Sequence, residues 1–254
     1  MRISVPHIPQ ASLLAKPSGL QITRAEAVDR LCRFIQEGRT TVLTGAGVSV
    51  DSGIRAYRGP DGRYMNPNYK PIFYHELMDD AEKGHHFRQR YWLRSYLGYP
   101  PVRDAQPNTT HFALASLLHS GNISRIITQH KPEVVFFGES IKQEVKQRSY
   151  HDIESSDQLL VVGTTLATYS AFRLVKHALD LKKPVILLNL GPTRADLLSN
   201  IEKINMASGT ILVDVARLII GRENQADPVL LNMLQSGVVN PPLPDDDRVP
   251  RAAG

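Results

Sequence analysis

The sequence has 254 residues, of which 42% are hydrophobic and 22% charged, a balance typical of a folded globular protein with one large domain or two small ones. Its net charge of +5 is scattered, without the basic block interleaved with aromatic residues that would indicate nucleic-acid binding, and no apolar run reaches the roughly 18 residues of a membrane-spanning helix. The single cysteine, Cys32, excludes an intrachain disulfide and a four-cysteine zinc site, and its place on the apolar face of a predicted helix indicates core packing.

The N-terminal segment is mildly basic. No acidic residue precedes Glu26, which is compatible with a flexible leader over residues 1–20 or with a mitochondrial transit peptide there. Thr23 and Glu26 have the spacing of a capping box, and apolar residues then recur at helical spacing until Gly38. This pattern predicts one helix between these residues.

The rest of the chain alternates strand-like and helix-like segments. Strands are expected at about 41–44, 123–128, 133–137, 158–163, 184–189 and 210–214. Helices are expected at about 80–97, 108–121, 140–149, 169–181 and 193–206, with a long loop at 59–75. Such alternation predicts an α/β domain over residues 21–221, with a doubly wound, mostly parallel sheet of about six strands. Residues 222–254 are expected to be largely disordered.

A glycine-containing turn follows the first predicted strand. Gly45 and Gly47 are separated by one residue, and a turn of this kind after a strand is where α/β proteins hold a dinucleotide diphosphate. Glycine permits the sharp turn and lets the backbone approach an anion. The usual fingerprint has a third glycine where this chain has Val50, so the spacing alone is a weak indication.

The full string from Val42 to Gly59 resembles the signature loop of the sirtuins, the NAD-dependent protein-lysine deacylases, which bind NAD without the three-glycine spacing. Residues 88–94 resemble a helix of the mitochondrial, class II branch of that family. Residues 131–139, 163–166 and 189–193 resemble its substrate-side strand and its second and third cofactor-binding turns. The resemblance covers about residues 20–220 and implies a Rossmann-like fold.

The resemblance implies NAD as the cofactor and acylated-lysine proteins as substrates. The implied cofactor-binding residues are Gly45, Ala46, Gly47, Ser49, Tyr57, Arg58, Thr128, Gln129, Gly163, Thr164, Thr165, Asn189, Leu190, Gly191 and Ser208. Among them, residues 45–47 and 49 would hold the phosphates through backbone and hydroxyl groups, and residues 57 and 58 would lie at the ribose–nicotinamide end. The implied substrate-side residues are Phe137, Gly138 and Glu139, which would pair with the substrate peptide as an added strand. The class II resemblance and the acid-free N-terminus favour a mitochondrial location, with the cytoplasm or the nucleus as the alternative.

The junction after Gln129 departs from the family pattern. In sirtuins, this strand continues into an Asn, an acid, a catalytic His-Gly pair and a four-cysteine zinc ribbon, whereas His130-Lys131-Pro132 follow here. Only the four residues from His130 to Glu133 separate the strand that ends at Gln129 from the apolar strand residues that begin at Val134, too few for a parallel crossover. The sequence therefore predicts an internal deletion at about 129–131 that removes the catalytic His, the zinc ligands and the small zinc-ribbon domain.

The deletion leaves no assigned catalytic residue, and His130 is only a weak candidate for a substitute base. The family reaction is NAD-dependent lysine deacylation, which releases nicotinamide and O-acyl-ADP-ribose, with ADP-ribosyl transfer as a second activity of class II relatives. A general base contributes about 10²–10⁴ in rate, so this chain is expected to be impaired or inactive. Three interpretations stay open: an incomplete version of a working enzyme, an NAD- or ADP-ribose-binding pseudoenzyme, and a fragment that folds poorly because apolar surface is exposed.

Overall fold

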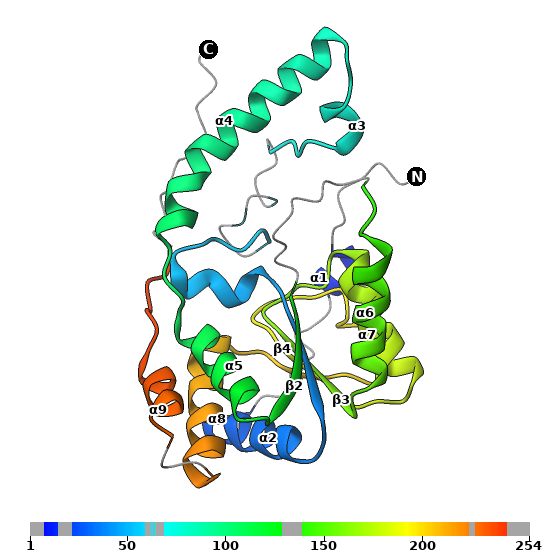
Figure 1. The fold of residues 1–254 in the computed structure, drawn as a ribbon. Helices are drawn as coiled ribbons and strands as arrows, with labels where there is room; N and C mark the ends of the chain where they lie inside the picture. The colour runs from blue at the N-terminus through cyan, green and yellow to red at the C-terminus, as the bar shows by residue number, and fades with distance from the viewer. Residues whose placement is uncertain are drawn as a thin grey trace.

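Five parallel strands form one sheet in the order β2-β1-β3-β4-β5 (Figure 1). The computed structural model describes residues 8–14, 22–58, 62, 64, 69–128, 139–223 and 227–242. The strands are β1 (Thr40–Thr44), β2 (Ile123–Thr128), β3 (Gln158–Val162), β4 (Val185–Leu188) and β5 (Glu202–Ile204). The predicted α/β fold with a parallel sheet is confirmed, and the strand expected at 133–137 lies outside the described residues.

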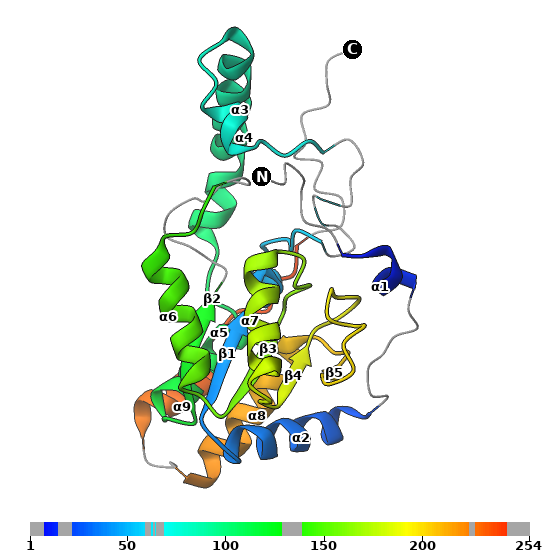
Figure 2. The ribbon, with the colours of Figure 1, turned by 90° about the vertical axis from the view of Figure 1, so that its right-hand side faces the viewer.

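Helices cover both faces of the sheet, as Figure 2 shows. One face carries α2 (Arg24–Gln36), α5 (Thr109–His119) and α8 (Ser208–Glu223), and the other carries α6 (Gln143–Glu154) and α7 (Tyr169–Asp180). Alternate strand residues enter two cores: Val42 and Leu160 pack with the α2–α5–α8 side, whereas Leu43 and Leu159 pack with the α6–α7 side. β1, β3 and β4 are buried throughout because both faces are covered.

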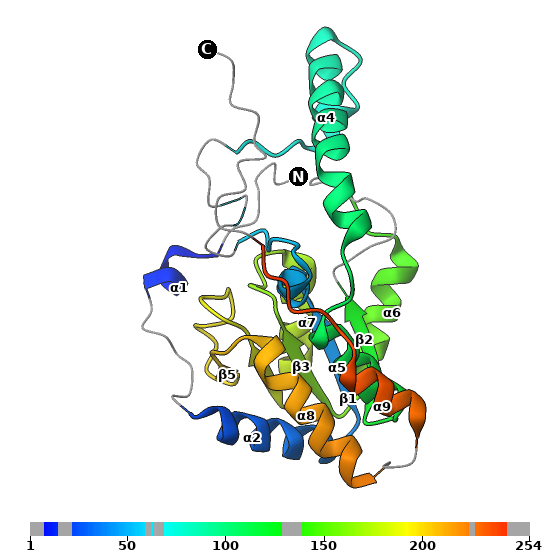
Figure 3. The same cartoon turned by 90° about the vertical axis from the view of Figure 1, so that its left-hand side faces the viewer.

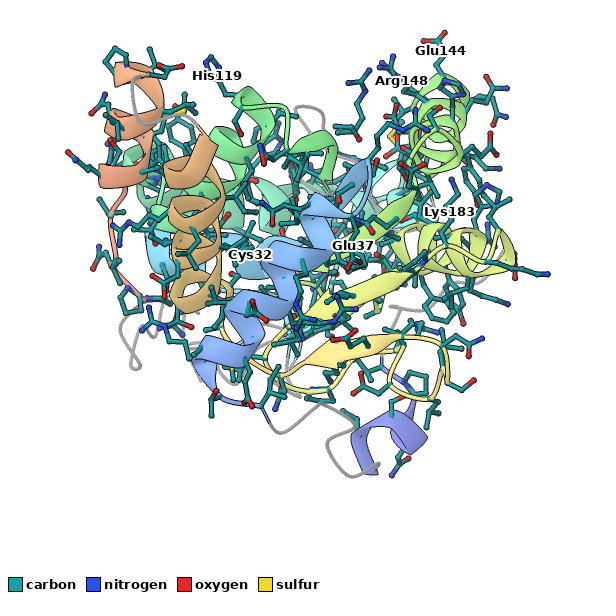
Figure 4. The ribbon with its side chains drawn as sticks, turned by 90° about the horizontal axis from the view of Figure 1, so that it is seen from below. Cys32, Glu37, His119, Glu144, Arg148 and Lys183 are labelled. Carbon is teal, nitrogen blue, oxygen red and sulfur yellow. The ribbon has the colours of Figure 1, made fainter. Side chains whose placement is uncertain are left out.

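The first long helix begins and ends as predicted. The Thr23 side chain accepts the backbone N–H of Glu26, and the Glu26 carboxylate accepts the backbone N–H of Thr23 at 2.7 Å, which completes the capping box. Cys32 is buried on this helix, and its Sγ lies 3.9 Å from the carbonyl oxygen of Val215 in α8 (Figure 4). The thiol therefore packs in the core, as expected.

A helical arm projects from the carboxyl edge of the sheet (Figure 1). It consists of α3 (Tyr74–Leu77) and α4 (Glu82–Asp104), so the loop predicted at 59–75 ends in a short helix. The helix predicted at 80–97 continues through Pro100 and Pro101. Proline lacks the N–H that would bond to the carbonyl four residues earlier. The corresponding residues Tyr96 and Leu97 are exposed, so water can satisfy these carbonyls.

The predictions for the C-terminal third were wrong in two places. The strand expected at 210–214 is the start of α8, and the helix expected at 193–206 is a series of turns followed by β5. Ile211 and Leu212 look strand-like alone, but with Val215 and Ile219 they form a buried face at helical spacing. β5 was missed because it is three residues long and its central residue is the charged Lys203.

Two further helices lie in segments that were expected to lack order. The short α1 (Gln10–Leu14) falls within the predicted leader, and α9 (Pro228–Gln235) within the predicted disordered tail. The Asp227 side chain caps α9 by accepting the backbone N–H groups of Val229 and Leu230, and Pro228 occupies the first turn. The expected disorder over residues 222–254 is therefore wrong for residues 228–235, where a capped helix forms.

Candidate cofactor site

The carboxyl ends of all five strands lie in one row. Strand register pairs Thr44 with both Thr128 and Val162, Val162 with Leu188, and Leu188 with Ile204. β2 lies on one side of β1, and the next strand in the chain, β3, lies on the other side, so the direction of strand addition reverses at β1. Ligands of open α/β sheets bind at the carboxyl edge beside such a switch point. The predicted turns that follow β1, β3 and β4 therefore share this edge.

The turns after β1 and β3 interlock. The backbone N–H of Gly45 donates to the Val162 carbonyl at 3.1 Å, and that of Gly47 to the Gly163 carbonyl at 2.8 Å. A Cβ added at Gly45 or Gly47 would lie 2.7 or 2.6 Å from the Gly163 oxygen, and one at Gly163 would lie 2.7 Å from the Val48 nitrogen. Only glycine permits this approach of two backbones.

This geometry changes the role expected for the two glycines of the first turn. The N–H groups of Gly45 and Gly47 already donate to the Val162 and Gly163 carbonyls, so any phosphate contact from this turn falls to its other backbone and hydroxyl groups. Their function is to bring the two turns into contact. Ala46, between them, begins the 3₁₀ helix η1 (Ala46–Ser52) and is half-buried at the edge.

Ser49 is held from α5. Its Oγ lies 3.1 Å from Nε2 of His111, while the backbone N–H of Asn108 donates to Nδ1 of the same ring at 3.1 Å. A neutral imidazole that accepts at Nδ1 carries its proton on Nε2, so the ring donates to Ser49. The Asn108 side chain also donates to the Val48 carbonyl at 2.8 Å. Sequence reasoning missed both supporting residues, although their three-residue spacing at a helix start was visible.

Aromatic and guanidinium groups gather beyond η1. The Tyr57 ring, 55% exposed, lies 5.8 Å from the Tyr64 ring, and the Arg58 guanidinium lies 4.6 Å from the Tyr64 centroid. Burial lowers the pKa of the Arg58 guanidinium, and the positive charge of Arg194 lowers it further. Arg194, which was not predicted, lies 4.4 Å over the Tyr169 ring. The predicted residues 57 and 58 therefore have a second guanidinium in their surroundings.

The second turn is joined to the loop after β4. Thr164 is buried, and its Oγ1 accepts the backbone N–H of Leu166 at 3.1 Å. The Thr165 carbonyl accepts the backbone N–H of Arg194 at 2.9 Å. Ser208 begins α8, not a strand end, and its Oγ lies 3.4 Å from that of Thr110. The structure thus places predicted residues from β1, β3 and the start of α8 around η1.

The third turn, which follows β4, is held by a buried ion pair. Asn189 follows β4, and its side-chain nitrogen lies 3.0 Å from the Leu190 carbonyl. The Gly191 backbone N–H donates to Asn205 Oδ1 at 2.9 Å, and its carbonyl accepts from Lys203 Nζ at 2.8 Å. Lys203 also pairs with Asp196 at 2.8 Å, with both side chains about 5% exposed. Leu190, in contrast, is 66% exposed at the edge.

The remaining predicted residues are only partly placed. Thr128 is exposed at the end of β2, and Glu139 is exposed before α6. Gln129, His130, Phe137 and Gly138 lie outside the described residues. The described part of the chain holds no cluster of three or more potential metal ligands and no helix long and apolar enough to cross a membrane.

Comparison with known proteins identifies the family. The Sir2 family model matches residues 45–130 and 129–170. An NAD-dependent protein deacylase, SIR4, of Batrachochytrium dendrobatidis is 32% identical over 297 aligned positions, which span 78% of this chain and 96% of that protein. The chain belongs to the Sir2 family. The mitochondrial NAD-dependent protein lipoamidase sirtuin-4 of Homo sapiens is 26% identical over 272 positions, with 74% of this chain and 85% of that protein covered.

Solved sirtuin structures share the fold. A mutant Sir2 homologue in complex with ADP-ribose has a TM-score of 0.65 and 22% identity, over 76% of this chain and 97% of that one. A Sir2 homologue in complex with NAD has a TM-score of 0.62 and 21% identity, over 76% and 94%. These likenesses show a common fold between this sirtuin chain and proteins solved with the nucleotide.

The alignments also bear on the predicted deletion. The two matches to the family model meet at residues 129 and 130. The Batrachochytrium alignment has 297 positions, but 78% of a 254-residue chain takes part in it, so about a third of the positions have no residue of this sirtuin opposite them. The relative therefore has sequence that this chain does not contain.

Proposed function

We propose that this sirtuin chain binds NAD through its ADP-ribose part at the carboxyl edge between β1, β3 and β4. The interlocked turns at Gly45 and Gly163 are the main support for the proposal. They form a cradle beside the switch point, and their backbones approach so closely that a side chain at either glycine would clash. Ala46 and Leu190 lie at the open side of this edge. The half-buried Arg58 guanidinium would offset the charge of the diphosphate.

We further propose that the parts of the nucleotide are divided among the three turns. Tyr57 and Arg58 would lie at the ribose–nicotinamide end, and Thr165, Asn189 and Leu190 would line the adenosine half. When bound, NAD would supply a ribose carbon that an acyl-lysine oxygen can attack, with nicotinamide as the leaving group. The chain's own contribution is to bind and orient the nucleotide, with Ser49 positioned by His111.

Deacylation by this chain is expected to be impaired. The family residues that would activate the ribose hydroxyl and ligate zinc have no counterpart in the sequence, whose one cysteine is buried between α2 and α8. NAD-dependent deacylation of acylated-lysine proteins is the reaction of the family. For these 254 residues we propose nucleotide binding with little or no turnover. Residues 137–139 would face the substrate. The mitochondrial human and bovine relatives support a mitochondrial location.

Calorimetric titration with ADP-ribose tests the binding. We expect saturable binding by the parent chain and its loss in Gly163→Ala, because the new Cβ would meet the Val48 nitrogen. Gly221→Ala, at a helical position with open space around the added carbon, is the matched control and should bind normally. No detectable heat with the parent chain at about 1 mM nucleotide would contradict the proposal. Deacylation of an acetyl-lysine peptide at the rate of a full-length sirtuin would contradict the expected impairment.

A further inference from the structure

A segment near the C-terminus runs from α9 back to the cofactor edge. This strap, residues 236–242, passes along α5 toward the turn after β1 (Figure 3). Its start is anchored by α9, whose Leu230 is 2% exposed in the core shared with α5 and α8. Arg217 of α8 also donates to the Leu234 carbonyl at 3.3 Å. The strap is therefore tied down at one end before it reaches the site.

Two backbone hydrogen bonds attach the strap to the site. The N–H of Val238 donates to the Pro107 carbonyl at 3.1 Å, just before α5. The N–H of Asn240 donates to the Asp51 carbonyl at 2.7 Å, within η1. Between α9 and these bonds, Gly237 has φ +109°, and a Cβ there would lie 2.5 Å from the Thr109 nitrogen. The strap thus requires a glycine to pass this close to the start of α5.

The two attachment points are the two elements that hold Ser49. One is η1, which contains Ser49, and the other is the start of α5, where Asn108 and His111 bond to η1. A 3₁₀ helix has poorer hydrogen-bond geometry than an α-helix, and runs longer than three or four residues are uncommon. The seven-residue η1 therefore needs external support, and the strap supplies it from the side of Asp51.

We propose that Asn240 is a positioning residue for the cofactor loop, whose backbone N–H holds η1 in its nucleotide-binding position. This inference rests on the proposed binding of NAD. Asn240 acts through the Asp51 carbonyl and contacts η1 by its main chain. Losing one backbone hydrogen bond changes an equilibrium by about 2- to 10-fold, so the strap should change nucleotide affinity by that factor.

A pair of substitutions at the same position tests the attachment of the strap to η1. Asn240→Pro removes the donor and places its ring Cδ against the Asp51 carbonyl, so it detaches the strap at this point, whereas Asn240→Ala keeps the N–H. With ADP-ribose as the probe in calorimetry, we expect Asn240→Pro to raise the Kd about 2- to 10-fold and Asn240→Ala to leave it unchanged. A purely structural role would lower the melting temperature without changing the Kd of the folded protein.

The outcomes separate the two proposals. If the parent chain binds and Asn240→Pro, still folded, binds equally well, the strap proposal is overturned while nucleotide binding stands. If the parent chain does not bind, both fail. Should Asn240→Pro not fold, amide hydrogen exchange of the parent chain decides: ADP-ribose should slow exchange in residues 236–242 as well as in η1. Protection of η1 alone would overturn the role of the strap.

Discussion

Replacing Lys203 with Met should remove the buried cation beneath the third turn. The Lys203 and Asp196 side chains are 5% and 4% exposed, and Lys203 Nζ lies 2.8 Å from both Asp196 Oδ2 and the Gly191 carbonyl. Thr193 also donates to Asp196 through its backbone N–H at 3.0 Å. The substitution would leave a buried carboxylate without its positive partner.

Breaking a buried ion pair on one side costs about 3–5 kcal/mol, because the remaining charge has lost its compensation. For a domain of this size, 1 kcal/mol lowers the melting temperature by about 2–4 °C, so we expect a decrease of roughly 6–20 °C. Urea denaturation followed by circular dichroism gives the free energy of unfolding directly. Because Lys203 also holds the Gly191 carbonyl, the variant should bind ADP-ribose more weakly at temperatures where it is folded.

Arg33→Met is the matched control. It breaks the pair with Asp29 on the surface of α2, where the two side chains are 62% and 67% exposed, and should cost less than about 1 kcal/mol. A double variant, Lys203→Met with Asp196→Leu, should recover much of the loss, because no charge is then left buried. The reasoning would be refuted if Lys203→Met lowered stability no more than the surface control.

Three further predictions concern separate parts of the fold. The hydrogen bonds from the side chain and backbone of Arg39 lower the pKa of Asp157, so the stabilisation by the Asp157 carboxylate is present at neutral pH and lost as the pH falls below about 4. In acid titrations, the difference in unfolding free energy between the parent and Asp157→Asn should therefore shrink over that range. His111→Ala should cost about 1–3 kcal/mol in urea unfolding, because Ser49 and the N-cap of α5 lose their partner, and a neutral result would show that water replaces the ring. Leu230→Ala should cost about 2–5 kcal/mol by the same measurement if α9 packs in the core, whereas a disordered tail would make it neutral.

Local chemistry made part of this structure predictable from sequence. The capping box at Thr23, the buried runs of β1 and β3 and the glycines at 45 and 163 each carry their own pattern, and all appear where expected. The partner of a residue was not predictable in the same way. In the sequence, Lys203 resembles a surface residue, and its burial depends on the ion pair with Asp196. His111 resembles an ordinary helix residue, and its role depends on the contact between α5 and η1. Long-range contacts decide such cases.

The contact between the turns after β1 and β3 has a consequence for how the protein folds. The two glycines that meet there come from distant parts of the chain, and a contact of this kind forms only after the entropy of closing a long loop has been overcome. Because the chain is made from its N-terminus, the turn after β1 emerges long before the turn after β3. The nucleotide cradle should be among the last features to form, and a ligand present during refolding should act on the final step and not on the early collapse.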